Sequence, residues 1–161
     1  EANCDFRKIE RFSDSVGVTL AEVLLNPTRI YVDPLVDLIA ETRMEGGVCG
    51  PESIKALAHI TGGGLSNLLR LHDSMGWHID EPLTPQPEFK WISEVGGVSD
   101  LEMHRTFNMG MGMVVAVDQA SANTISKWLN ERLPGTRIVG HITSGDRVVT
   151  HSNPEVIFDK Y

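Results

Sequence analysis

Apolar residues recur every three or four positions in several segments of the chain, which is the spacing of an amphipathic helix. The segment that begins at Thr19 also carries Glu22 three residues later. This arrangement is typical of a capping box, in which each side chain satisfies a free amide of the other residue. The pattern predicts helices over residues 19–25, 34–43, 65–72, 88–97 and 100–107, and a last helix that contains Ile125 and ends before Pro134.

Capping residues and buried faces can be predicted for several of these helices. Asp33 is the expected N-cap of the second helix, with Pro34 at its first position. Ser99 and Glu102 form a second capping box pattern, and Gly96 with Gly97 should close the helix over 88–97. The residues expected to face the core are Leu35, Leu38 and Ile39 in one helix, Leu65, Leu68 and Leu69 in another, and Ile125, Trp128, Leu129 and Leu133 in the last.

Runs of apolar and β-branched residues predict the strands. The last two runs are expected to form a hairpin around Ser144, Gly145 and Asp146. Residues 76–90 contain three prolines and are predicted to be an extended surface connection. Strands and helices are interleaved, so the expected fold class is α/β or α+β, a mixed β-sheet with helices packed against it. The predicted strands are residues 28–32, 53–60, 112–117, 136–143 and 147–151.

The composition narrows the class of protein. A chain of 161 residues that is 41% hydrophobic is long enough for one domain, 1–161, with a sizeable core. Its 22 acidic against 14 basic residues give a net charge of -8, which argues against nucleic acid as a partner. We find no membrane-spanning run and no signal-peptide pattern. Cys4 and Cys49 form no CxxC pattern, and the histidines lack metal spacing, so we predict no metal site and a cytoplasmic location.

Three consecutive glycines, Gly62, Gly63 and Gly64, separate the predicted strand 53–60 from the helix that follows. A glycine inside a regular element costs roughly 0.5–1 kcal/mol relative to alanine, so the triplet indicates a sharp turn or a close approach to the backbone. A strand end followed by a helix start exposes backbone amides, which suits a phosphate or carboxylate. A turn with positive φ and no ligand explains the triplet as well, and both interpretations stay open.

A second glycine-containing stretch precedes the predicted strand 112–117. Asn108 and Gly110 fit a helix C-cap in the left-handed region. Gly110 and Gly112, spaced by one residue, also allow a ligand or a helix to approach the backbone closely. The two interpretations are compatible with each other.

Three motifs, PTRIYV (27–32), AHITGGG (58–64) and RTFNMGMGM (105–113), occur in this order and at about this spacing in phosphoribosylformylglycinamidine cyclo-ligase, also called aminoimidazole ribonucleotide (AIR) synthetase. The chain is similar to this family from about Thr19 to Gly140. The resemblance implies the C-terminal, substrate-side domain of an ATP-dependent ligase of purine biosynthesis. That enzyme converts formylglycinamidine ribonucleotide and ATP to aminoimidazole ribonucleotide, ADP and phosphate.

The resemblance also implies a separate N-terminal domain that is absent from this sequence. In the family that domain holds most of the ATP site, with Mg²⁺, and makes most of the homodimer contact. The active site lies between the two domains, so the isolated chain is expected to be inactive. The segment GGGLSNLLR (62–70) departs from the family's approximate pattern GGGLxENIPR, because it is one residue shorter and lacks the acidic residue. Asn67 and Arg70 still align with the asparagine and the arginine of that pattern.

The candidate site residues follow from the glycine stretches and the resemblance. His59 is the candidate catalytic residue, since it can polarise the amide or orient the phosphate; a structural, hydrogen-bonding histidine is the alternative. Arg29 and Arg105 can each contact a phosphate or form a surface salt bridge, and Thr61 can donate its hydroxyl. The candidate residues for the substrate and its phosphate are Thr61, Gly62, Gly63, Gly64, Asn67, Arg29, Arg105, Asn108, Gly110 and Gly112.

Two other functions stay open at this stage. One is a non-catalytic module that binds an anion or a nucleotide. The other is a domain of a different ATP-dependent synthetase of the same superfamily, against which the RTFNMGMGM motif argues. The expected partners are a small ribonucleotide phosphate, the N-terminal domain of the same enzyme and, for the full-length protein, a second copy. Neither nucleic acid nor membrane is expected.

Overall fold

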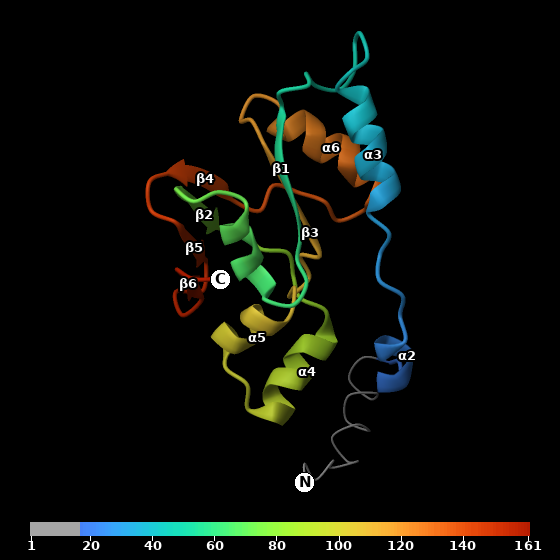
Figure 1. Ribbon diagram of the computed structural model, residues 1–161. Helices are drawn as coiled ribbons and strands as arrows, with labels where there is room; N and C mark the ends of the chain where they lie inside the picture. The colour runs from blue at the N-terminus through green and yellow to red at the C-terminus, as the bar shows by residue number, and fades with distance from the viewer. Residues whose placement is uncertain (1–16) are drawn as a thin grey trace.

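The computed structural model describes residues 17–161, so Cys4 lies outside the described residues. Figure 1 shows the course of the chain, and none of its described helices is long and apolar enough to span a bilayer. The helices are α2 (Leu20–Leu24), α3 (Val32–Glu41), the 3₁₀ helix η1 (Gly64–Arg70), α4 (Pro87–Gly96), α5 (Asp100–Thr106) and α6 (Ala122–Arg132). The strands are β1 (Ile54–His59), β2 (Met75–Ile79), β3 (Met113–Val117), β4 (His141–Ser144), β5 (Val148–His151) and β6 (Ile157–Phe158).

The capping box predicted for α2 is confirmed. The hydroxyl of Thr19 accepts a hydrogen bond from the Glu22 amide at 3.2 Å, and the Glu22 carboxylate accepts one from the Thr19 amide at 2.8 Å. The strand predicted over 28–32 is wrong. Residues 26–31 form an extended connection to α3 (Figure 1), and Ile30 is 68% exposed. Strand propensity mainly reflects packing on a sheet, and this segment joins no sheet.

The helix that follows begins earlier than predicted. Tyr31 is its N-cap, without a side-chain hydrogen bond, and Asp33 lies inside the first turn. Pro34 is tolerated there because the first amides of a helix have no intrahelical acceptor. Leu35 and Leu38 are buried as predicted.

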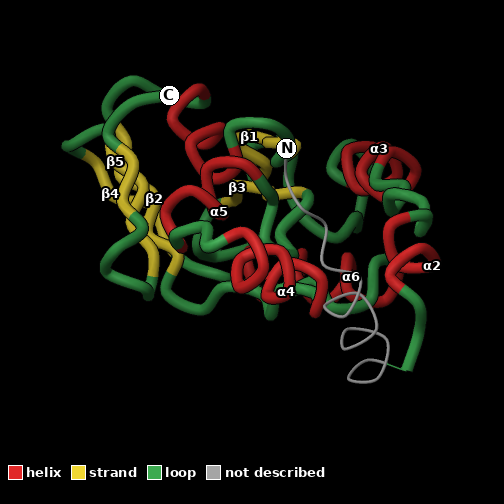
Figure 2. Tube along the Cα trace, turned by 90° about the horizontal axis from the view of Figure 1, so that it is seen from below, coloured by secondary structure: helices red, strands yellow, loops and turns green. Residues whose placement is uncertain are grey.

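β1 and β3 form an antiparallel two-stranded sheet, in which His59 pairs with Met113 and Leu57 with Val115. Both strands were predicted. Figure 2 shows this sheet between the four-stranded sheet on one side and α3 on the other. Partly buried side chains of both strands pack against a buried cluster between α3 and α6, which consists of Leu35, Leu38, Ile125, Leu129 and Leu133. The predicted apolar faces of α3 and α6 therefore meet on one side of this sheet.

The second sheet is mixed and has the strand order β4-β2-β5-β6. β2 pairs antiparallel with β4 and parallel with β5, so the predicted hairpin between the last two strands is wrong. The prediction of residues 76–90 as a surface connection is also wrong for its first part, because β2 occupies it. Trp77 and Ile79 are each only 5% exposed. β2 is short and contains Gly76, so its strand conformation depends on having a partner on both sides.

The core between the two sheets is built around η1. Leu65, Leu68 and Leu69 are completely buried, as predicted, although the segment is a 3₁₀ helix and not an α-helix. Val149 and Phe158 of the second sheet belong to the same cluster. The fold class is confirmed as α/β (α+β), with one mixed and one antiparallel sheet and helices packed against them.

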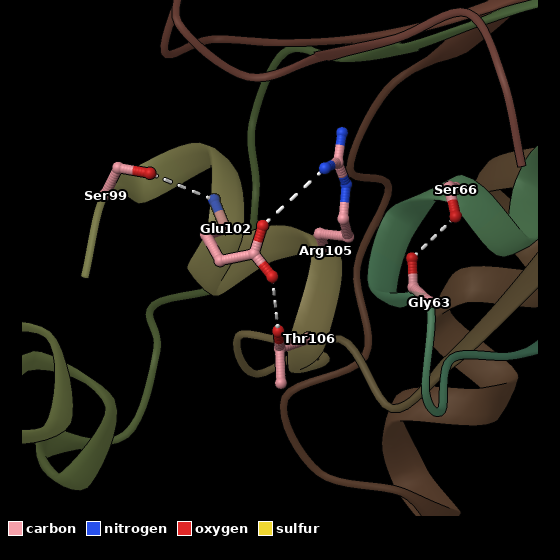
Figure 3. A network of polar contacts seen from close by, with 6 residues as sticks. All are labelled: Gly63, Ser66, Ser99, Glu102, Arg105 and Thr106. Carbon is pink, nitrogen blue, oxygen red and sulfur yellow. Dashed lines mark hydrogen bonds and ion pairs between the residues drawn. The ribbon is translucent and has the colours of Figure 1, made fainter. Parts of the chain in front are cut away.

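α4 and α5 lie at the end of the molecule that carries the glycine stretches (Figure 1). Gly97, with φ of 61°, closes α4 as predicted. Ser99 caps α5 by accepting a hydrogen bond from the Glu102 amide at 3.4 Å. The Glu102 carboxylate instead accepts from the Thr106 hydroxyl at 3.3 Å and pairs with Arg105 (Figure 3), so the structure shows only the serine half of the second capping box.

Candidate functional site

The two glycine stretches meet in space. The amide of Ile60 donates a hydrogen bond to the carbonyl of Gly112 at 2.9 Å, directly beyond the last pair of β1 and β3. The triplet therefore starts beside Gly112, although the two stretches are far apart in the sequence. We refer to Thr61, Gly62, Gly63 and Gly64 as the glycine corner.

The backbone of the glycine corner turns through two left-handed residues. Gly63 has φ of 94° and Gly64 has φ of 53°, which residues with a side chain rarely adopt. The amide of Gly64 donates to the carbonyl of Thr61 at 2.8 Å. The carbonyl of Gly63 accepts from both the amide and the hydroxyl of Ser66, at 3.1 and 2.7 Å; the hydroxyl bond is drawn in Figure 3. The corner is thus a fixed turn.

Close packing explains one of the three glycines. A Cβ on Gly64 would overlap the carbonyl oxygen of His104 and would lie 3.0 Å from the carbonyl carbon of Arg105. α5 therefore lies so close to the main chain at Gly64 that there is no room for a side chain on this residue. Gly64 is buried, so the structural interpretation of the triplet is confirmed for this residue.

Gly62 is in the opposite situation. It is exposed, and a Cβ placed on it would meet no atom within 4 Å. Within residues 17–161, the amides of Gly62 and Gly63 donate no hydrogen bond. These two N–H groups are the part of the corner that an anion can use, so the ligand interpretation stays a prediction for this pair.

Asn67 holds the corner together. Its side-chain nitrogen donates to the carbonyl of Gly62 at 3.1 Å and to the carbonyl of Gly64 at 2.8 Å, and the residue is 5% exposed. Both donor hydrogens of this amide are therefore used within the turn. Asn67 can influence a ligand through the shape of the corner.

The structure places the two candidate arginines differently. The backbone of Arg105 lies against Gly64, and its half-exposed guanidinium pairs with Glu102 at 3.6 Å. Arg29 donates to the carbonyl of Pro134 at 2.8 Å, just beyond the end of α6. Arg105 is thus the one of the two that adjoins the glycine corner.

Tyr31 is a neighbour that sequence reasoning missed, although it lies within the PTRIYV motif. Its ring meets the exposed His59 edge-on, with centroids 5.9 Å apart. A Cβ on Gly112 would overlap the Tyr31 hydroxyl. The close approach predicted at Gly112 is therefore made by a side chain of the protein itself.

The remaining candidates form a tight turn. The side-chain oxygen of Asn108 accepts from the amide of Gly110 at 3.0 Å, and its carbonyl accepts from the amide of Met111 at 2.9 Å. The helix C-cap predicted at Asn108 and Gly110 is wrong, because α5 ends with Phe107 as its C-cap and the left-handed residues that follow are Met109 and Gly110. Asn108 and Gly110 thus shape the entry into β3.

Tyr161 and Arg70 complete the surroundings of the corner. A Cβ on Gly63 would lie 3.3 Å from a ring carbon of Tyr161. The guanidinium of Arg70 lies 5.0 Å from the centre of that ring and 3.4 Å from its hydroxyl. No sequence pattern could have placed Tyr161 here, because the contact depends on the path of the chain after β6.

Comparison with known proteins agrees with the resemblance. Residues 5–153 match the family model described as AIR synthase related protein, C-terminal domain. The chain is 42% identical to the phosphoribosylformylglycinamidine cyclo-ligase of Methanopyrus kandleri over 84% of this chain and 36% of that protein. It is 38% identical to the protein of the same name from Methanocaldococcus jannaschii, over 90% of this chain and 42% of that protein. Its identity to the Burkholderia cenocepacia protein of this name is 46%, over 69% of this chain and 30% of that protein.

The chain thus spans well under half the length of the curated relatives it matches. The family model nevertheless covers nearly all of it, including both glycine stretches and the strands that bring them together. The chain belongs to the family of AIR synthase related proteins, as their C-terminal domain.

Proposed function

We propose that the chain is the C-terminal, substrate-side domain of a phosphoribosylformylglycinamidine cyclo-ligase. The relatives that carry this name support the proposal, as does the meeting of the HITGGG and RTFNMGMGM motifs at one corner. The reaction is the ATP-dependent closure of formylglycinamidine ribonucleotide to aminoimidazole ribonucleotide in purine synthesis. The chemistry would then take place in the cytoplasm.

In this reaction ATP phosphorylates the formyl amide oxygen, so that the oxygen leaves as phosphate. An amidine nitrogen of the substrate attacks the activated carbon and closes the imidazole ring. Such a reaction depends mainly on positioning and on stabilising charge. A domain that fixes the ribose phosphate of the substrate would therefore contribute directly to the rate.

The glycine corner is the proposed phosphate site of this domain. The free amides of Gly62 and Gly63 point to a ligand that accepts hydrogen bonds, and the Thr61 hydroxyl can add another donor. The backbone of Arg105 adjoins the corner, and its guanidinium, which pairs with Glu102, is the proposed source of positive charge for the phosphate. His59, at the end of β1, is the proposed group that orients or polarises the reacting amide.

ATP and Mg²⁺ are assigned mainly to a further domain of the full-length protein. Among residues 17–161, no three His, Cys, Asp or Glu side chains converge as metal ligands would, so these residues do not fit a complete Mg²⁺ site. The greater length of the curated relatives supports such a domain. We propose that the full-length enzyme is a homodimer and that this chain alone does not close the ring.

One observation carries the assignment of the corner: Gly62 is exposed with its amide free, while Gly64 is buried under α5. The test is a titration of the ¹⁵N-labelled chain with inorganic phosphate and with ribose 5-phosphate. We expect the largest amide shifts at Gly62 and Gly63. Amide shifts confined to other parts of the chain would refute the assignment of the phosphate site to the glycine corner.

A second experiment tests the reaction. The full-length protein, assayed for aminoimidazole ribonucleotide from formylglycinamidine ribonucleotide and ATP, should be active, and a Gly62→Ala variant should show a raised KM for the ribonucleotide. Transfer of the ATP phosphoryl group to a different acceptor, without ring closure, would contradict the proposal. Phosphate binding by the chain without any ring closure by the full-length protein would instead favour a non-catalytic module.

A further inference from the structure

Two histidines outside the glycine corner form a close pair. His104 lies on α5 and His151 is the last residue of β5. Their ring centres are 4.7 Å apart, with an angle of 58° between the planes. His104 is 7% exposed, and His151 is partly buried. The pair joins α5 to the end of β5, where the chain turns toward β6.

The hydrogen bonds of the pair fix which ring nitrogens carry protons. Nδ1 of His104 lies 2.8 Å from the carbonyl oxygen of Asp100, which can only accept, so this nitrogen is protonated. Nδ1 of His151 accepts from the amide of Asn153 at 3.0 Å, so this nitrogen is not. Neutral His151 therefore has its proton on Nε2. That atom is buried and has no hydrogen-bond partner in the described part of the chain.

A second proton has no favourable place on His151. It would have to go to Nδ1, where it would face the N–H of Asn153 and abolish the hydrogen bond between them. The resulting cation would lie beside the ring of His104. Burial lowers the pKa of His151, His104 lowers it further, and Asp100 opposes them. The neighbouring strand β2 places the uncharged Ile79 opposite His151.

We propose that the His104–His151 pair is an acid-sensitive contact that holds the segment after β5 on α5, and that protonation of His151 releases this segment. The chain after β5 also contacts α5 through the Asn153 side chain, which donates to the Asp100 carboxylate at 2.7 Å, and through Phe158, whose ring centre lies 5.9 Å from the guanidinium of Arg105. The carbonyl of His104 is also the atom against which Gly64 packs. Release would therefore loosen the backing of the glycine corner. This inference is independent of the proposed reaction.

The sign of the effect follows from linkage. Because the pKa of His151 is lowered in the folded chain, the unfolded chain binds more protons below the ordinary histidine pKa of about 6.5. The contribution of the pair to stability is complete above about pH 6.5 and is lost as the pH falls below it. Acidification should thus lower the melting temperature.

Long-range ¹H–¹⁵N spectra of the chain near pH 7.5 test the proton positions directly. We expect protonated Nδ1 in His104, and unprotonated Nδ1 with protonated Nε2 in His151. On acidification, His151 should titrate below about pH 6.5, together with a change at the Asn153 amide. The opposite tautomers, or titration of His151 at or above about pH 6.5, would overturn the proposal.

Melting temperatures at about pH 7.5 and about pH 5.5 test the mechanical consequence. The His151→Asn variant keeps an acceptor near the Nδ1 position but cannot be protonated, so its melting temperature should fall less than that of the original chain. The matched control is His72→Asn, since His72 is exposed and lies outside the pair. The melting temperature of this control should fall as much as that of the original chain. An equal fall in all three proteins would refute the inference, and the spectra decide the question if His151→Asn does not fold.

Discussion

Substitution of Gly64 by alanine tests most sharply why the triplet exists. The new Cβ would overlap the carbonyl oxygen of His104 and would come within 2.7 Å of its carbonyl carbon. Both are backbone atoms of α5, so they cannot rotate away as the end of a side chain can. The φ of 53° adds a second cost, because residues other than glycine rarely adopt it.

The two costs can be estimated separately. A left-handed backbone conformation costs an L-residue roughly 1–2 kcal/mol. Overpacking a well-filled site costs typically about 1–3 kcal/mol. The Gly64→Ala variant should therefore lose about 2–5 kcal/mol of unfolding free energy, which is a large part of the 5–15 kcal/mol that is typical of a domain.

Urea unfolding followed by circular dichroism measures this loss. With a slope of about 2 kcal/mol per molar urea, the midpoint should fall by about 1–2.5 M. The matched control is Gly62→Ala in the same turn, where the φ is not left-handed and no atom lies within 4 Å of the new Cβ. Its stability should be unchanged, or higher by about 0.4–1 kcal/mol, because alanine restricts the unfolded chain.

The reasoning would be refuted if Gly64→Ala had the midpoint and slope of the original chain. Equal losses in both variants would also contradict it, because Gly62 would then have a packing role that the structure does not show. Phosphate titration of the same two proteins separates stability from binding. Gly62→Ala should keep its stability and bind phosphate more weakly, since the methyl group would stand beside the free amides.

Three further substitutions test the surroundings of the corner and the core. Asn67→Ala removes the hydrogen bonds to the carbonyls of Gly62 and Gly64, of which the second is buried, and should lower the unfolding free energy by about 1–3 kcal/mol in the same urea experiment. Gly112→Ala should displace the Tyr31 ring, seen as a change in the near-ultraviolet circular dichroism, and should cost less than Gly64→Ala because a side chain can move. Leu38→Ala leaves a cavity between α3 and α6 and should cost about 2–5 kcal/mol, measured as a lower melting temperature; a loss below about 1 kcal/mol would mean that the site is not tightly packed.

The corner shows that one motif can combine two requirements. Gly64 provides the close contact with α5, and Gly62 leaves the main chain open to solvent. The sequence offered packing and ligand binding as alternatives for the whole triplet. The structure shows packing at Gly64 and leaves the ligand at Gly62 and Gly63 as a testable proposal.

The sequence by itself determined the features that depend on neighbours a few residues apart. The Thr19 capping box, the glycine that closes α4 and the buried leucines of η1 were all predicted correctly. Their energies come from hydrogen bonds, backbone preferences and periodic burial within one or two turns of chain. The two strands beside the glycine stretches were predicted for the same reason, since β1 is a mostly apolar run and β3 a continuous one.

Only the tertiary structure decided how distant segments meet. β2 lies between β4 and β5 because strand pairing is set by the whole sheet, and a short strand with Gly76 has little preference of its own. The residues 28–32 resemble a strand but find no partner, and Tyr31 instead fills the space at Gly112. Contacts between residues far apart in the sequence depend on the relative placement of whole elements, and no local pattern encodes that placement.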